Sequence, residues 1–342
     1  MAGFAWSATV CFFMLASSLG QVAPKPEPLR RLELAETHMG SEFKIVLYSP
    51  DEPTARRACR LAFDRIAALD AIFSDYQPES ELMRLCDHAG GPPVPVSEDL
   101  FTILQRSKQT YERSSGAFDV TVGPVVRLWR RARRERKLPA PATLNRALAL
   151  VSCRFMILDP EKRTVQLTKP GMKLDLGGIA KGYASDAAIR VLKEQGITRA
   201  LVAGAGDIVM SGPPPDSKGW RIGIARLEDP NLPPERFLLL HDVAISTSGD
   251  TERYVEIDGK RYSHIVDPKT GLGVVDRCSV TVVAPDGATA DALDTAVYCL
   301  GPDRGLPLIE STPHTSGYIV RDTPAGKSIR ESTRFRELLQ AP

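Results

Sequence analysis

The sequence predicts an α+β fold, and three observations support this class. Segments with strand-like alternation come in runs, and segments with helical periodicity stand between the runs, so the order is not a regular βαβ repeat. The chain has no internal repeat and no clear interdomain linker. With 342 residues, 43% of them hydrophobic, it is long enough to form one large core or two lobes.

The first half of the chain predicts a strand pair, three helices and a hairpin. Residues 33–48 alternate like two strands joined at Met39-Gly40-Ser41. Apolar residues recur with a helical period over 53–73, and the turn residues of 73–80 end that pattern. We expect two further helices over 100–114 and 142–151, and a hairpin over 155–167.

The second half predicts five strands between two helices. The first helix, over 183–196, closes with glycine. The second has Thr289 as its N-cap and ends at Gly301. The expected strands cover 200–210, 220–225, 237–245, 254–257 and 278–284.

The N-terminus is typical of a secretory signal peptide. Residues 4–15 are mostly apolar, and small residues follow over 16–20. The segment departs from the usual pattern because no lysine or arginine precedes the apolar run. We expect residues 1–20 to be a signal peptide, 21–31 a polar spacer and 32–342 the exported domain, with an uncleaved membrane anchor as the minor alternative.

Charge and cysteine spacing exclude several classes. A formal net charge of +2 gives no reason to expect nucleic-acid binding, and no apolar run in the body of the chain is long enough to span a bilayer. The five cysteines after residue 20 have no CxxC spacing, which argues against a metal cluster or a disulfide framework. We expect small buried side chains, with one disulfide as the alternative.

The most informative stretch is KLDLGGIAKGYASD, residues 173–186. Gly177 and Gly178 let a backbone approach a ligand closely, and Lys181 places a charge near a helix N-terminus, which already favours anions. The spacing matches neither a P-loop nor a dinucleotide fingerprint. These residues indicate a phosphorylated ligand, and a helix entry whose glycines only permit tight packing explains them equally well.

Asp291 and Thr295 stand four residues apart, so a helix places them on one face. A carboxylate and a hydroxyl form a partial shell for Mg²⁺, which prefers oxygen ligands and often shares them with phosphates. Taken alone, the pair is better explained by a helix-start carboxylate and a solvent-facing threonine.

Several motifs decide between these interpretations because they occur together and in order. They are FSDYQPESEL (73–82), SGAFDVTVGP (115–124), KLDLGGIAKGYASD (173–186), TSGD (247–250), HIVDPKTG (264–271) and ADALDT (290–295). In this order they strongly resemble the ApbE family of FAD:protein FMN transferases, from about residue 33 to about residue 310. The resemblance implies one domain of mixed, largely antiparallel sheets flanked by helices, with a ligand cleft between two lobes.

The resemblance also implies an activity and a location. The expected reaction is Mg²⁺-dependent transfer of FMN from FAD to a threonine or serine hydroxyl of an exported redox protein, through a phosphoester bond and with release of AMP. The expected location is the periplasm or the periplasmic side of the membrane, including peripheral membrane association. An FAD pyrophosphatase that uses water as the acceptor and a non-catalytic exported flavin-binding protein are the alternatives.

Individual roles follow from the same resemblance. Gly178, Asp291 and Thr295 fall at Mg²⁺-ligating positions, and His264 falls where the base for the incoming hydroxyl is expected. The FAD-contacting positions are Met39, Tyr76, Ala117, Phe118, Asp119, Asp175, Lys181 and Ile265. The chain departs from the family at Cys86 and Ala205, and at Ser263, where a first histidine is usual, so that only His264 is available as the base.

Two features have alternative interpretations. Tyr76 fits either a ring that stacks on the isoalloxazine or a core residue. The basic run RLWRRARRERK, residues 127–137, fits a solvated helix face, which we favour over a dock for an acidic partner or a membrane surface.

Overall fold

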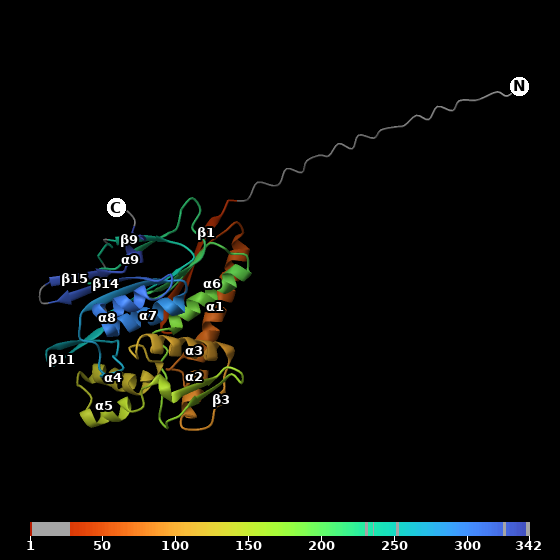
Figure 1. The fold of residues 1–342 in the computed structure, drawn as a ribbon. Helices are drawn as coiled ribbons and strands as arrows, with labels where there is room; N and C mark the ends of the chain where they lie inside the picture. Colours follow the sequence, from red (N-terminus) through yellow and green to blue (C-terminus); the bar gives the residue numbers. More distant parts are fainter. Residues whose placement is uncertain (2–27, 230–231, 235, 251–252, 324–325, 340–342) are drawn as a thin grey trace.

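The central element of the computed structural model is an eight-stranded sheet (Figure 1). The structure describes residues 1, 28–229, 232–234, 236–250, 253–323 and 326–339. All neighbouring strands of the sheet are antiparallel, which confirms the predicted α+β class. In spatial order the strands are β1 (Arg30–His38), β2 (Ser41–Ser49), β6 (Ala200–Gly204), β7 (Asp207–Met210), β10 (Ala244–Gly249), β13 (Cys278–Ala284), β14 (Ser316–Thr323) and β15 (Gly326–Glu331).

Helices cover one face of this sheet. Helix α6 (Ala180–Glu194) packs on β6 and β7, and α7 (Gly287–Leu300) packs on β10 and β13. Helix α1 (Glu52–Phe73) packs against α6 and the β1–β2 edge, and α8 (Pro302–Glu310) follows α7 (Figure 1). The main core lies between these helices and the sheet.

The other face of the sheet has a smaller core. The hairpin of β8 (Trp220–Ile224) and β9 (Arg236–Leu240) covers it together with α9 (Thr333–Arg336). Strand alternation supplies both cores, because successive side chains point to opposite faces. In β2, Ile45 and Leu47 join the main core and Val46 joins the smaller one.

A second lobe lies at the end of the molecule opposite β9 and α9 (Figure 1). Its small elements are α2 (Glu81–Asp87), α3 (Glu98–Arg113), α4 (Gly123–Glu135), α5 (Pro141–Leu148), β3 (Val94–Pro95), β4 (Met156–Asp159), β5 (Thr164–Leu167) and the short 3₁₀ turns Val120–Val122 and Cys153–Phe155. A third core lies between α4, α5 and the hairpin of β11 (Tyr254–Ile257) and β12 (Lys260–Ser263).

The predicted elements differ from this fold at several places, of which three concern the division of strands and a helix cap. Residues 200–210 form two strands because Ala205, with φ of 57°, and Gly206 make a turn between them. Residues 237–245 are divided between β9 and β10, which belong to different sheets, and Asp242 has a φ of 51° in the connection. The N-cap of α7 is Asp286 rather than Thr289, whose N–H donates to the Asp286 carboxylate at 2.9 Å.

The predicted signal peptide, beyond Met1, and residues 21–27 of the spacer lie outside the described residues. Strand β1 begins at Arg30, two residues before the predicted start of the domain. Within the described ranges, no helix has both the length and the apolar character needed to cross a bilayer. The five cysteines of this part are free thiols, four of them buried and Cys299 half-buried, as the prediction of small buried side chains requires.

Candidate functional site

The GGIAKG segment leads into α6, which begins three residues earlier than predicted. Lys181 is therefore the second residue of the helix. The N-cap residue, Ile179, has no side chain that can accept the free N–H groups of the first turn. Asp291, on α7, supplies one such acceptor to the N–H of Gly182 at 3.1 Å.

Helices α6 and α7 cap each other at their N-termini. Asp186, on α6, accepts the N–H groups of Gly287 at 2.7 Å and Ala288 at 3.0 Å. A Cβ atom on Gly182 would lie 2.1 Å from the carbonyl oxygen of Gly287, so only glycine permits this crossing. Burial raises the pKa of Asp186 to about 6. The crossing brings the predicted metal ligand Asp291 to the start of the lysine-bearing helix.

Three buried carboxylates gather around Lys181. Its Nζ lies 2.6 Å from Oδ2 of Asp207 and 3.7 Å from Oδ2 of Asp291. The Ser246 hydroxyl contacts Asp207 and donates to Asp294 at 2.6 Å. Asp207 and Asp291 are each 3% exposed and Asp294 is 1% exposed, so the charges of this cluster are withdrawn from solvent.

One lysine does not neutralise three acids. Burial, and after it repulsion by Asp207, raises the pKa of Asp291 to about 7, even though Lys181 lowers it. Burial and the same kind of repulsion raise the pKa of Asp294 well above its usual value. Burial alone would lower the pKa of Lys181, but Asp207 and Asp291 more than reverse this and raise it. Buried charges need partners, so the excess negative charge of the cluster must be balanced by a further cation or by protons on the carboxylates.

The three predicted metal residues meet beside this cluster. A Cβ atom on Gly178 would lie 3.0 Å from Oγ1 of Thr295, so the glycine backbone and the hydroxyl are neighbours. Thr295 stands one turn after Asp291 on α7, 3.4 Å from the Ser248 hydroxyl. Asp291 is buried and is the fifth residue of α7, which excludes the helix-start carboxylate as its explanation.

These oxygen donors fit Mg²⁺ better than they fit a softer metal. Among the described residues, no group of three or more His, Cys, Asp or Glu side chains forms a ready metal centre. A single carboxylate, a hydroxyl and a backbone carbonyl are a sparse set, which suits an ion that keeps waters and shares substrate phosphates.

A second constellation links Asp175 to Tyr76 through an arginine. Arg130, on α4, donates to Oδ2 of Asp175 at 2.9 Å and also contacts Asp75. Its Cζ lies 4.2 Å from the centre of the Tyr76 ring. Burial, and after it the Asp75 charge, raises the pKa of Asp175, which Arg130 opposes.

The contacts of Arg130 change two interpretations of the sequence. Tyr76 is 74% exposed, so it is not a core residue, and the ring is accessible for stacking. Arg130 lies in the basic run, for which we favoured a solvated face, and that interpretation is wrong for this residue. The buried neighbour Trp129 was the available signal, because it shows which side of α4 faces the protein.

The SGAFD motif packs behind the metal residues. A Cβ atom on Gly178 would lie 3.3 Å from the Phe118 ring, and Ala117 and Phe118 are both buried. The Asp119 carboxylate accepts hydrogen bonds from Thr121 and Cys153, each through its backbone N–H and its side chain, and burial raises its pKa. Asp119 therefore holds the local loop, and its contact with FAD stays a prediction.

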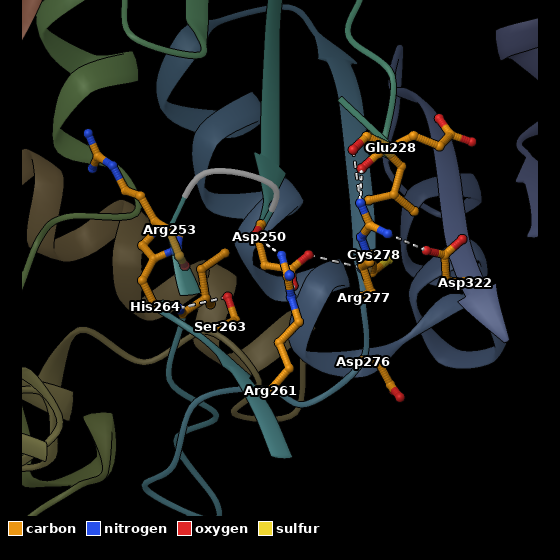
Figure 2. Close-up of polar contacts among 12 residues, drawn as sticks. Glu228, Asp250, Arg253, Arg261, Ser263, His264, Asp276, Arg277, Cys278 and Asp322 are labelled. Carbon is orange, nitrogen blue, oxygen red and sulfur yellow. Dashed lines mark hydrogen bonds and ion pairs between the residues drawn. The ribbon is translucent and has the colours of Figure 1, made fainter. Parts of the chain in front are cut away.

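His264 follows β12 and is held by one carbonyl. The Arg253 oxygen accepts from the His264 backbone N–H at 3.0 Å and contacts Nδ1 at 3.1 Å (Figure 2). This contact favours the neutral tautomer with its hydrogen on Nδ1. Burial and the nearby cations lower the pKa of His264 to about 4. At neutral pH Nε2 carries a lone pair and has no hydrogen-bond partner among the described residues, as a general base requires.

The remaining predicted residues lie at the edges of the site. Met39 is in the β1–β2 turn with a φ of 50°, and its N–H donates to Asp70 at 3.1 Å. Ile265 is half-buried beside the main core. Asp250, in the TSGD turn, is buried and ion-paired with Arg261 at 2.8 Å (Figure 2). Asp207, Ser246 and Arg130 were not predicted.

Comparison with known proteins gives a consistent result. The ApbE family model matches residues 39–319. The FAD:protein FMN transferase of Vibrio cholerae serotype O1 is 31% identical over 327 residues, which is 94% of this chain and 97% of the relative. One from Klebsiella pneumoniae is 34% identical over 268 residues, 78% of this chain and 82% of the relative.

Solved structures have the same fold. The flavin transferase ApbE from Vibrio cholerae has a TM-score of 0.81 and 29% identity, and the match covers 91% of this chain and all (100%) of that one. The apo form of Pseudomonas stutzeri flavinyl transferase ApbE has a TM-score of 0.80 and 28% identity, with coverage of 92% and 98%.

Proposed function

Because this chain belongs to the ApbE family, we propose that it transfers FMN from FAD to a threonine or serine hydroxyl of an acceptor protein, with Mg²⁺ as cofactor and AMP as the product released. The observation that carries the proposal is the buried carboxylate cluster around Lys181, with Gly178 and Thr295 beside it. Its surplus of carboxylates over cations supports a metal ion next to a lysine that suits phosphate.

The bonds exchanged in this reaction are defined by its products. The acceptor hydroxyl oxygen forms a bond to the phosphorus of the FMN phosphate, and the bond from that phosphorus to the oxygen of AMP breaks. AMP leaves with the bridging oxygen. His264 Nε2 takes the proton of the hydroxyl, which is a weak nucleophile without a base.

Gly178 through its carbonyl, Asp291 and Thr295 would hold the metal. A bound Mg²⁺ neutralises charge on the phosphates of such a reaction. Lys181 supplies a second positive charge, and Asp207 fixes its position at 2.6 Å. Ser246 and Ser248 in turn hold Asp294, so the cluster is ordered before substrate binds.

We extend the proposal to location. The apolar segment over 4–15 and the small residues after it support export, so the acceptor is expected to be an exported redox protein. N-terminal sequencing of the protein from its native cells is expected to give a chain beginning near Gln21, outside the cytoplasm. A cytosolic protein that retains Met1 would contradict export.

Product analysis tests the activity itself. The purified protein is incubated with FAD, MgCl₂ and candidate exported acceptors, and the products are separated by chromatography and by in-gel flavin fluorescence. Protein-bound FMN with an equal amount of AMP is the expected result. Free FMN with AMP would identify a pyrophosphatase, and unchanged FAD would identify a flavin-binding protein; either result overturns the transferase.

A further inference from the structure

The hairpin that leads to His264 is packed against the second lobe. Its strands β11 and β12 contribute apolar side chains to the third core, which they share with α4 and α5. The ring N–H of Trp129, on α4, also donates to the carbonyl of Ser263 at 3.1 Å. The predicted metal ligands Asp291 and Thr295 belong instead to α7, which packs on the central sheet. The position of the base relative to the metal residues therefore depends on how the hairpin is joined to that sheet.

A buried ion pair makes this connection (Figure 2). Asp250 directly follows β10 and is 1% exposed. Arg261, on β12, donates from Nε to Oδ2 of Asp250 at 2.8 Å and from Nη2 to its backbone carbonyl at 2.7 Å. The N–H of Cys278, the first residue of β13, donates to Oδ1 of the same carboxylate at 3.4 Å. Asp250 thus joins the hairpin to two neighbouring strands of the central sheet.

The guanidinium group of Arg261 is fixed in its direction. It contacts Asp250 at two points, and its Cζ lies 3.4 Å from the centre of the Tyr254 ring on the neighbouring strand β11. A lysine would bring one point charge without the second contact. The Asp250 side chain is 2% exposed, so loss of the arginine would leave a buried charge without its ion partner.

Both ends of the ion pair lead to the site. Ser248, two residues before Asp250, donates to Asp294 of the carboxylate cluster at 2.9 Å. His264 comes three residues after Arg261 and directly follows β12. The pair therefore connects the strand that orders the cluster to the strand that ends at the base. Movement of β12 relative to β10 would change the distance between His264 and the metal residues.

We propose that Arg261 and Asp250 are positioning residues for the transfer, because they hold the hairpin of His264 at a fixed position relative to the metal residues. The inference rests on the proposed function. It also gives a role to the aspartate of the TSGD motif, which takes no part in the steps described above. Both Asp250 carboxylate oxygens already accept hydrogen bonds, so this residue acts through His264 and is not a second base.

The variant Arg261→Gln tests the positioning role. We expect its kcat for flavin transfer to fall by about 30-fold, because misplacement of a catalytic group by about 1 Å can lower a rate by about 10²-fold. FAD affinity should stay within about twofold of wild type, since the pair makes no contact with the carboxylate cluster. Arg261→Lys keeps the charge without the two-point contact and should recover about threefold of the lost rate. In-gel flavin fluorescence of the acceptor measures the rate, and titration by flavin fluorescence measures FAD affinity.

A double-mutant cycle with His264→Ala shows whether the pair acts through the histidine. When Arg261→Gln is added to His264→Ala, we expect the residual transfer to fall by less than about threefold, because the group being positioned is already absent. The residual rate is measured as protein-bound flavin over long incubations. Asp250→Asn keeps the size of the side chain and repeats the cycle from the other partner, so the test does not depend on the folding of one variant.

Arg277→Gln is the matched control. The Arg277 side chain is 33% exposed, against 25% for Arg261, and it pairs with Asp322 on β14 at 3.1 Å instead of with the hairpin (Figure 2). Because such a pair near the surface contributes little, we expect transfer by this variant to stay within about twofold of wild type.

Four outcomes would overturn the inference. They are an unchanged kcat in Arg261→Gln, the same loss from Arg261→Gln with and without His264, an equal loss in the Arg277→Gln control, and a fall in FAD affinity that accounts for the lost rate, which would assign the pair to cofactor binding. Failure of the proposed function is seen separately, as the absence of AMP release and of protein-bound FMN with the wild type and candidate acceptors.

Discussion

The carboxylate cluster on α6 and α7 and two arginines near His264, Arg133 and Arg253, have opposite surplus charges and differ in depth. The cluster is buried, and its three acids share one lysine and two serine hydroxyls. The arginine pair lies nearer the surface and has no acid among the described residues, although the neighbouring Arg130 has two. The buried surplus of negative charge supports the metal ion of the proposed function, whereas the arginines near the surface have no role in holding that ion.

This difference predicts that mutations in the two regions affect different properties of the protein. Changes to the cluster should abolish metal binding and chemistry with every acceptor. Changes to Arg133 and Arg253, which lie outside the cluster, should leave metal binding and the chemistry on FAD intact. The predictions below are arranged from the largest expected effect to the smallest.

Removal of the metal carboxylate should have the largest effect. Asp291→Ala is expected to lower the transfer rate by about 10³-fold or more, because the metal that neutralises the phosphates is no longer held. EDTA should act on the wild type in the same way, and Thr295→Ala should have a smaller effect because a neutral hydroxyl is a weaker ligand. Asp303→Ala removes an exposed acid from α8 and serves as the control. Full activity of Asp291→Ala in excess EDTA is incompatible with this site.

Removal of the base should separate chemistry from binding. His264→Ala is expected to lower transfer by about 10²–10⁴-fold and to leave FAD and Mg²⁺ affinity nearly unchanged. Because the pKa of His264 is about 4, the base stays neutral and active from pH 8 down to pH 6. His264→Asn keeps a donor for the Arg253 carbonyl and controls for loop structure. A joint loss of stability, FAD affinity and activity in His264→Ala, with all three restored in His264→Asn, would make the histidine structural instead.

Stability of the metal-free protein should fall as the pH rises. The pKa of Asp291 is about 7 in the folded protein and near 3.8 when unfolded, so the folded state holds a proton that the unfolded state has lost between these values. Its contribution is complete below about pH 4 and is lost as the pH approaches 7, an effect of about 4 kcal/mol at 1.36 kcal/mol for each pKa unit. Thermal unfolding in EDTA of wild type and Asp291→Asn measures it. A difference between them that does not change with pH would exclude this titration.

The smallest effect is expected at Arg130. Arg130→Ala leaves Asp175 beside Asp75 without a cation and removes the group that lies over Tyr76, so FAD affinity should fall by about tenfold. Arg130→Lys keeps the charge but loses the two-acid contact, and it should recover only part of the affinity. The measurement is FAD titration by flavin fluorescence. Unchanged affinity in Arg130→Ala would remove this arginine from the site.

Local patterns in the sequence predicted the strands β1 and β2 and the helices α1, α3, α6 and α7, because strands and helices follow their own periodicity. They did not predict the strands β14 and β15 of the central sheet or the helices α2, α4 and α8. They also failed where one residue redirects the chain. Ala205 adopts a positive φ in the turn between β6 and β7, and Asp242 does so between β9 and β10. Neither turn has the Asn-Gly or Pro-Gly sequence that would have marked it.

The residues of the site also fall into two groups, those that local motifs predict and those that depend on distant contacts. The motifs predicted Gly178, Asp291 and Thr295, and the structure brings them together. Asp207 and Arg130 could not be predicted because their roles depend on partners far away in sequence. In the sequence, Asp207 is only an acid at the start of a strand, and its ion pair with Lys181 forms because α6 packs beside that strand. Arg130 is one of several arginines in the basic run, and only the fold shows that it pairs with Asp75 and Asp175.

The most direct test of the comparison is a calorimetric titration of MgCl₂ into the metal-free protein in the presence of FAD. We expect about one bound ion for the wild type and for Arg133→Gln/Arg253→Gln, and none for Asp291→Asn. This pattern would place the cation at the buried cluster and exclude the two arginines from metal binding. Equal Mg²⁺ affinity in the wild type and in Asp291→Asn would contradict the account.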